Sequence, residues 1–319
     1  MSWYLTLPLV IPFVAAIIAY LLRSSPLGAW VSIIGSGLGL IASIALMAVV
    51  LDAGVVAGQM GNWPAPFGIT LVADLLSAVM VLITAITGFA VAIYALGDIT
   101  ERQAKLGYHA LFQLLLAGVT GAFLTGDLFN LYVWFEVMLI ASFGLLILNG
   151  GKEQIDGGVK YVALNLISTI LFLTGIGLLY GMTGTLNFAD LAVKVNEVEN
   201  QGLLTVVAMM FMVAFGVKAA VFPLFFWLPA AYHTPSFSVS AVFAGLLTKV
   251  GVYALIRMFT MVFDHDIGFT HTVLLWVACL TMVVGVLGAA AQSDFRKILS
   301  FHIVSQIGYM VLRLALMTP

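Results

Sequence analysis

The chain has 319 residues, of which 63% are hydrophobic and only 8% are charged, and its mean hydropathy is +1.16. Soluble domains have about 25% charged residues, so this composition excludes a soluble globular protein and indicates an all-α polytopic membrane protein. The net charge of −2 carries no information about partners, and we expect no nucleic acid among them. The only cysteine, Cys279, lies in an apolar run, so no disulfide forms within the chain.

About ten transmembrane helices are expected, because about 20 apolar residues are enough to span a bilayer. They cover residues 4–22, 28–51, 71–96, 108–125, 128–148, 160–182, 203–228, 236–262, 271–291 and 298–317. The first residues lack the basic segment of a cleavable signal peptide. The longest link lies near 183–202, and its segment Leu186–Val198 has the pattern of a short amphipathic helix.

Basic residues are distributed unevenly between the links, and this distribution predicts the orientation. The odd-numbered links carry Arg23, Arg102, Lys105, Lys152, Lys160, Arg296 and Lys297, whereas the even-numbered links carry only Lys194. Lysine and arginine are enriched in cytoplasmic links. The odd-numbered links are therefore expected in the cytoplasm, which leaves the N-terminus outside the cell.

The stretch from Lys218 to Lys249 combines two lysines with three prolines, Pro223, Pro229 and Pro235, in apolar surroundings. A lysine at the centre of a membrane helix costs about 2.5–3.5 kcal/mol on insertion scales, so a chain that keeps two is expected to use them. Proline breaks or kinks a helix, and irregular backbone at membrane depth survives only inside protein or beside a wet cavity. The combination indicates an ion pathway.

Glu136 lies inside the expected span 128–148, about 12 Å along the helix and close to the middle of the membrane. A carboxylate at that depth either becomes neutral or finds a cation. Two interpretations stay open at this point, a purely structural ion pair and a proton relay with a lysine of matching depth.

Lys218 and Lys249 allow a similar choice. Lys218 precedes Pro223 by five residues and either caps carbonyls freed by the proline or exchanges protons. Burial favours the neutral amine and a nearby carboxylate favours the ammonium, so a Lys/Glu pair that separates can catch and release a proton. Lys249 lies about 20 Å along the span 236–262, again near the middle of the membrane.

Other polar residues carry weaker signals. His302, in the span 298–317, either continues a proton wire or is a satisfied interior histidine. His233 lies between prolines and is a candidate for a proton entry, whereas Asp74 is more typical of a helix start than of a relay. The spacing of Asp264, His265, Asp266 and His271 superficially resembles a set of metal ligands, but their link is short and exposed, and no metal site is expected. No nucleotide loop, cysteine cluster or cofactor ligand set occurs, so no cofactor is expected.

Three motifs together resemble a known family. They are KAAVFPLFFWLPAAYHTPSFSVSAVFAGLLTKVGVYALIR, GDLFNLYVWFEVMLIAS around Glu136, and DFRKILSFHIVSQIGYM from Asp294 to Met310. This pattern resembles the antiporter-like subunits shared by respiratory complex I, membrane-bound hydrogenases and Mrp-type cation/proton antiporters. The run PLFFWLP is most similar to the D-subunit branch of the Mrp type, because Phe225 stands where complex I subunits usually carry histidine.

The resemblance implies about fourteen helices, with inverted five-helix repeats that each contain one broken helix. It divides this chain into three leading helices at 1–97, a first repeat at 108–262 broken near 218–229, and the start of an incomplete second repeat at 271–319. It also implies that Glu136 pairs with Lys218, and that Lys249 relays protons toward the second repeat. A proton-relay role for His302 is a weaker implication.

Two features depart from the family pattern. The chain ends at Pro319, before the second broken helix and its lysine, which is expected of a fragment or a truncated gene. Arg313 occupies a position where relatives usually carry glycine, and it adds a charge to the last span.

The sequence therefore predicts a transporter subunit rather than an enzyme. The first hypothesis is the proton-translocating subunit of a multi-subunit Mrp-type Na⁺/H⁺ antiporter in the cell membrane, with partner subunits of the A, B, C, E, F and G types. A second hypothesis is a proton-pumping subunit of complex I or a hydrogenase. A third is a scaffold subunit that transports nothing.

Overall fold

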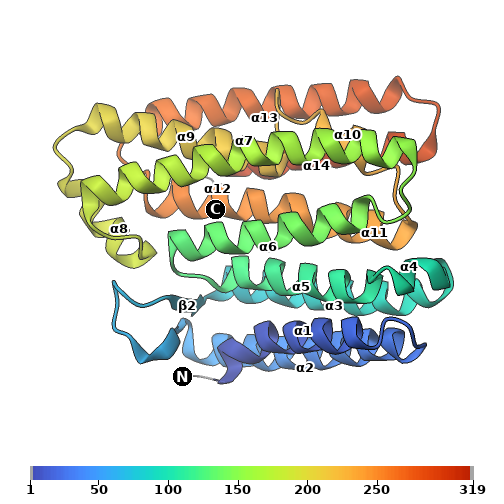
Figure 1. The fold of residues 1–319 in the computed structure, drawn as a ribbon. Coiled ribbons are helices and arrows are strands. Elements are labelled where there is room, and N and C mark those ends of the chain that lie inside the picture. The colour runs from blue at the N-terminus through green and yellow to red at the C-terminus, as the bar shows by residue number, and fades with distance from the viewer. Residues whose placement is uncertain (1–2, 317–319) are drawn as a thin grey trace. The chain divides into compact units, whose positions relative to one another are not determined.

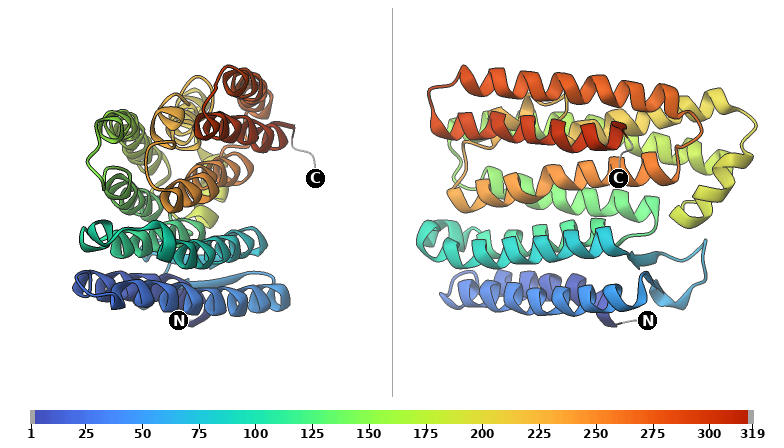
Figure 2. Two further views of the ribbon diagram at one scale, coloured as in Figure 1. Left: turned by 90° about the vertical axis from the view of Figure 1, so that its right-hand side faces the viewer. Right: turned by 180° about the vertical axis from the view of Figure 1, so that it is seen from behind.

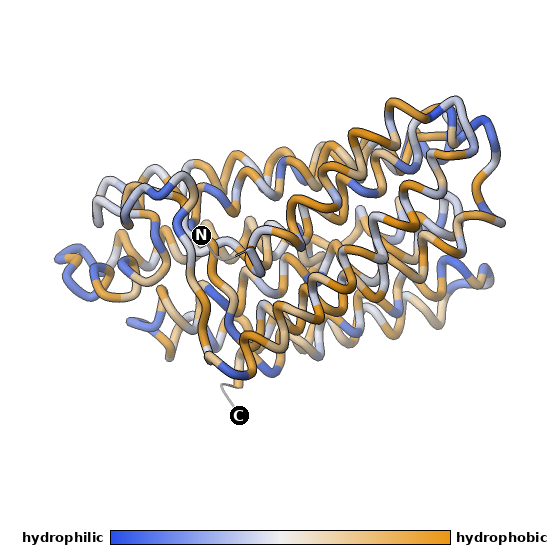
Figure 3. Tube along the Cα trace, turned by 90° about the horizontal axis from the view of Figure 1, so that it is seen from below, coloured by the Kyte–Doolittle hydropathy of each residue, from blue (hydrophilic) through white to orange (hydrophobic). Residues whose placement is uncertain are grey.

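The computed structural model describes residues 3–316, and these residues form two compact units. The first unit contains the chain up to Gly151 together with Pro235–Leu246. The second unit contains Lys152–Thr234 and the chain from Leu247 onward. Each unit is a bundle of helices. Figure 3 shows hydrophobic residues along the helices and hydrophilic residues gathered near their ends.

The first unit contains seven helices and one β-hairpin within the described residues. The helices are α1 (Trp3–Leu21), α2 (Leu27–Ala53), α3 (Leu75–Asp98), α4 (Glu101–Lys105), α5 (Tyr108–Leu124), α6 (Leu128–Leu146) and α11 (Phe237–Val242). Helix α1 packs against α2 and α5, and α6 packs against α5 (Figure 1). Helix α11 joins this unit because the Asp98 carboxylate at the end of α3 accepts hydrogen bonds from the Ser238 backbone N–H and hydroxyl, at 2.8 and 2.5 Å.

The hairpin is a feature that the sequence did not predict. Strands β1 (Val56–Gln59) and β2 (Thr70–Ala73) pair antiparallel, with Val56 opposite Ala73 and Gln59 opposite Thr70. The strands lie in the link before α3, and Asp74 then caps that helix by accepting from the Ser77 N–H at 2.9 Å. The expectation that Asp74 is a helix-start carboxylate is therefore confirmed.

The second unit contains the remaining helices of the described residues. They are α7 (Lys152–Thr183), α8 (Phe188–Lys194), α9 (Gln201–Ala219), α10 (Trp227–Ala231), α12 (Thr248–Met261), α13 (Ile267–Ala290) and α14 (Phe295–Leu316). Helices α13 and α14 lie side by side (Figure 2). They approach closely because Gly285 faces the backbone of Ser305, where a side chain on residue 285 would collide at 2.5 Å.

The expected short helix within Leu186–Val198 is confirmed as α8. Asn187 caps it by accepting from the Ala189 and Asp190 N–H groups at 3.1 and 3.3 Å. Thr185, which precedes the helix, and Lys194 in its last turn hold the pKa of the Asp190 carboxyl below its usual range, in that order of importance. This short helix thus carries its own cap and its own ion pair, between Lys194 and Asp190 at 3.2 Å.

The polytopic membrane fold is also confirmed. Within the described residues, nine helices are long and apolar enough to span a membrane, and α5 is a shorter apolar helix. Helix α7 begins at Lys152, eight residues before the expected start of its span at 160, and an ion pair at 2.6 Å joins Asp156 to Lys160 in this added segment. The two compact units do not follow the predicted boundaries 1–97, 108–262 and 271–319, which describe repeats rather than contacts, and the repeats stay a prediction.

Candidate functional site

Lys218 lies in the last turn of α9 and is buried, with 9% of its surface exposed. Lys218 follows Phe211 by seven residues and Phe215 by three, so it lies on the same face of α9 as these two rings. Both rings pack on Phe172 of α7, with centroid distances of 5.5 and 4.8 Å. The C-terminal end of a helix favours a cation, so the position stabilises an ammonium that the apolar stripe desolvates.

Helix α9 ends next to Lys218, and side chains from elsewhere stabilise this end. Ala220 adopts a left-handed conformation with φ of 61°, an unusual choice for a residue other than glycine. The indole of Trp227 donates to the Val217 carbonyl at 3.0 Å, and the Phe222 N–H donates to the Thr281 hydroxyl at 2.9 Å. The groups that a broken helix leaves without helical partners are thus satisfied by side chains.

The prolines of the central stretch lie beyond this helix end. Pro223 falls in the non-helical segment 220–226, and Pro229 lies within the five-residue helix α10. The Pro229 carbonyl accepts from Nδ1 of His233 at 2.8 Å. A carbonyl only accepts, so this contact requires the His233 proton on Nδ1. The chain resumes a spanning helix at Phe237.

Lys249 is half-buried on α12, directly after a π-helical segment at Phe243–Leu247. Such segments often occur at functional sites. The hydroxyl of the neighbouring Thr248 is fully buried and has no hydrogen-bond partner among the described residues. Buried hydroxyls are normally satisfied, so this group has hydrogen-bonding capacity that none of the described residues uses.

Helices α9 and α12 meet at Gly251, close to both lysines. A Cβ on Gly251 would lie 2.5 Å from the backbone nitrogen of Ala219 and 2.8 Å from the carbonyl carbon of Lys218. Only glycine allows this approach. Lys249 precedes Gly251 by two residues, or about 200° of helix rotation, so its side chain leaves α12 on a different face.

Glu136 belongs to the first unit, where it is half-buried on α6. Asp127 caps this helix by accepting from the Asn130 N–H at 2.7 Å, and burial raises the pKa of the Asp127 carboxyl. Trp134 and Met138, two residues on either side of Glu136, pack on glycines of α5. Glu136 therefore points away from α5 within its unit. The Glu136–Lys218 pair links residues of different units and stays a prediction.

The His302 ring lies on the exposed face of α14, 3.3 Å from the Gln306 amide, and its role as a relay stays a prediction. Within the described residues, no group of three or more His, Cys, Asp or Glu side chains could hold a metal ion. In the acidic link before α13, Nε2 of His265 lies 3.3 Å from the Thr205 hydroxyl, and Asp266 caps α13 by accepting from the Phe269 N–H.

A family model matches residues 125–319, which include both lysines, Glu136 and the break after α9. Its description is NADH:quinone oxidoreductase/Mrp antiporter, transmembrane. This chain belongs to that family. The matched residues contain all three sequence motifs and the break in the helix after Ala219.

Individual family members resemble the chain over most of its length. The D-type subunit of a Na⁺/H⁺ antiporter from Alkalihalophilus pseudofirmus is 52% identical over 279 residues, which cover 88% of this chain and 57% of the relative. A chain in the structure of the Mrp complex from Dietzia sp. DQ12-45-1b superposes with a TM-score of 0.91 at 35% identity, covering 99% of this chain and 59% of that one. A chain of respiratory complex I from Thermus thermophilus superposes with a TM-score of 0.81 at 25% sequence identity, covering 98% of this chain and 64% of that one. The chain thus spans less than two thirds of the length of these family members.

Several residues that shape this site were not singled out from the sequence. Gly251 and Thr281 contact the region around Lys218 from helices that lie far along the chain, so no local pattern reveals them. Trp227 carried a weak signal, because a tryptophan near a proline-rich break has an indole N–H that needs an acceptor. These residues of the family fold position Lys218.

Proposed function

We propose that this chain is a proton-translocating subunit of a multi-subunit Mrp-type antiporter that exchanges a monovalent cation, Na⁺, for protons. The observation that carries the proposal is Lys218, a buried lysine in the last turn of α9, next to the break in the helix and on a stripe with Phe211 and Phe215. A membrane protein keeps such a charge at considerable cost, and ion pathways are the usual reason. The similarity to the D-type subunit of a Na⁺/H⁺ antiporter supports the Mrp type.

In the proposed mechanism, Lys218 accepts a proton and releases it when its electrostatic partner changes. Glu136 is the proposed partner, Lys249 passes the proton onward, and His302 extends the path. Because Lys249 leaves α12 on a different face from Gly251, transfer between the lysines requires a bridging hydroxyl or water. The buried Thr248 hydroxyl is suited to that bridge.

The proposed location is the cell membrane, with the N-terminus outside. The excess of lysine and arginine in the odd-numbered links supports this orientation. The proposed partners are subunits of the A, B, C, E, F and G types, as the similarity to a chain of an Mrp complex suggests. As part of an antiporter that ion gradients drive, the chain makes and breaks no covalent bonds.

The test is cation-dependent dissipation of a pH gradient in everted membrane vesicles that contain the full-length protein with its partner subunits. Lys218→Ala and Glu136→Gln are expected to abolish the Na⁺-induced signal while the complex still assembles. Lys152→Ala is the matched control, because it removes an exposed lysine at the start of α7 and is expected to leave the signal unchanged.

The outcomes separate the three hypotheses. An unchanged signal in Lys218→Ala, with normal assembly, would make the chain a scaffold. A wild-type complex that ignores Na⁺ but acidifies vesicles when electrons are supplied would favour a proton pump like complex I, to which the chain is also similar. A Na⁺ response lost only in the two charge variants supports the antiporter.

A further inference from the structure

The leading helices of the first unit contain a buried polar cluster that is separate from the charged residues discussed above. Gln113 of α5 is fully buried, and its Nε2 donates to the Ser32 carbonyl at 2.7 Å, the Ser36 hydroxyl at 2.7 Å and the Ser32 hydroxyl at 3.0 Å. The Ser32 carbonyl only accepts, so the amide orientation follows from its partners. The oxygen of Gln113 therefore faces the other way.

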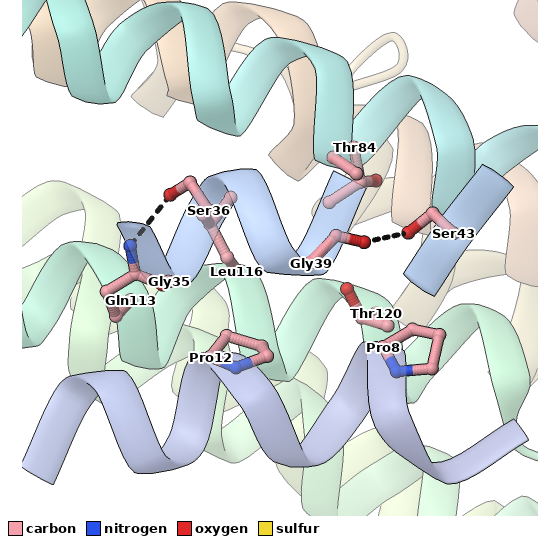
Figure 4. Close-up of a pocket in the computed structure, with 11 residues that line it drawn as sticks. Pro8, Pro12, Gly35, Ser36, Gly39, Ser43, Thr84, Gln113, Leu116 and Thr120 are labelled. Carbon is pink, nitrogen blue, oxygen red and sulfur yellow. Dashed lines mark hydrogen bonds between the residues drawn. The ribbon is translucent and has the colours of Figure 1, made fainter. Parts of the chain in front are cut away.

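That oxygen, Oε1, is buried and has no hydrogen-bond partner among the described residues. Gln113 lines a cavity of about 20 Å³ between α1, α2, α3 and α5. Figure 4 shows this cavity, with Pro8 and Pro12 on one side and Ser36 and Gly39 on another. An amide oxygen without a donor costs about 1–3 kcal/mol, so a donor is needed at this place.

Other groups around the cavity supply further hydrogen-bonding capacity. Thr120 lies two turns beyond Gln113 on α5 and lines the cavity with its hydroxyl pointing toward α2 (Figure 4). Pro12 has no N–H, so the Pro8 carbonyl lacks the donor that a helix would normally provide. Ser36 accepts from Gln113 and still has its hydroxyl hydrogen to donate.

We propose that this cavity is a binding site for one ordered water molecule. The water donates to Oε1 of Gln113 and accepts from the hydroxyl of Ser36, which lines the same cavity and contacts the Gln113 amide. A water needs about 10–15 Å³ and two to four polar partners, and the cavity provides both. No lining residue carries a charge, which disfavours a cation, since a buried ion needs a compensating partner.

The bound water has a structural role. The cavity lies near the middle of α5, between residues about 8 and 18 Å from the start of that helix. Its lining contains no titratable side chain, so the site has no group to pass a proton on. The water instead ties α2 to α5, next to the prolines of α1 that line the same cavity.

The test is a high-resolution map of the full-length protein, purified with its partner subunits in Na⁺ buffer and again in choline buffer. We expect one density peak within hydrogen-bond distance of Oε1 of Gln113 in both buffers. No peak in either buffer would make the cavity dry, and a peak in Na⁺ buffer alone would make it a cation site. Either result overturns the proposal.

Two variants identify the groups that hold the water. Gln113→Met removes the amide at nearly constant volume and is expected to abolish the peak. If that variant fails to assemble, Ser36→Ala removes only a hydroxyl and is expected to weaken the peak, with Thr174→Val as the control, because Thr174 is exposed and bonds its own helix at the Ile170 carbonyl. A peak of unchanged height in the tested cavity variant would contradict the assignment.

Discussion

Two buried polar side chains, Gln113 in the first unit and Lys218 in the second, are held in different ways. In the first unit, Gln113 is neutral and uses its N–H groups to join helices α5 and α2 through two serines. In the second unit, Lys218 brings an ionisable amine to the last turn of α9. The neutral group sits among continuous helices, whereas the ionisable group sits where the backbone departs from helical geometry.

This difference between Gln113 and Lys218 indicates that different polar groups of a membrane protein serve stability and transport. A neutral amide with satisfied N–H groups can join helices at any physiological pH, because it does not ionise. A lysine in the last turn of a helix carries an ionisable group, and the proton exchange proposed for it requires surroundings that change. Fixed hydrogen bonds suit a residue that stabilises the helix packing, and surroundings that can change suit a residue that exchanges protons.

The largest effect is expected from Gly251→Val. The new side chain would collide with the backbone of Ala219 at 2.5 Å, which cannot move without shifting the end of α9. Overpacking typically costs about 1–3 kcal/mol, and the backbone contact favours the upper end. Both thermal stability and transport per assembled complex should fall. Gly177→Val is the control, since residue 177 has no neighbour within 4 Å, and equal losses in the two variants would refute the close contact.

A smaller and different effect is expected from Gln113→Leu. Loss of its three hydrogen bonds should cost about 2 kcal/mol, at roughly 0.6 kcal/mol for each bond inside a membrane protein. The measurement is the melting temperature of the purified complex together with transport per assembled complex. Stability should fall while the transport of the surviving complex stays normal, whereas Gln201→Leu, at an exposed amide, should change neither. A transport defect without lost stability would contradict the structural role that we assign to Gln113.

The smallest effect is expected from Thr281→Val, which removes the acceptor for the Phe222 N–H at the helix break. One hydrogen bond corresponds to about 0.6–1.7 kcal/mol, so stability should change little. The looser break should alter the surroundings of Lys218 and move the pH profile of transport. Thr174→Val removes an exposed hydroxyl within one helix and should leave that profile in place. A profile unchanged in Thr281→Val would mean that the break is held by other contacts.

The sequence by itself determined the membrane class and the approximate helix ends. Composition and the length of apolar runs decide these features, because hydrocarbon forces each chain segment to satisfy its own backbone. The starts of α3 and α6 follow from the capping residues Asp74 and Asp127 for the same local reason. The sequence also singled out Lys218 and its prolines, since a charge in an apolar run is visible without any structure.

Only the tertiary structure decided which distant groups surround those residues. A break near 218–229 was expected within the span 203–228, and α9 ends at Ala219, but only the structure shows that Trp227 and Thr281 satisfy backbone groups of the broken segment. The β-hairpin before α3 and the Gln113 cluster were also invisible, because each depends on partners from another segment. Hydrophobic periodicity records which residues are apolar, whereas hydrogen bonds between helices depend on register and rotation, which only packing determines.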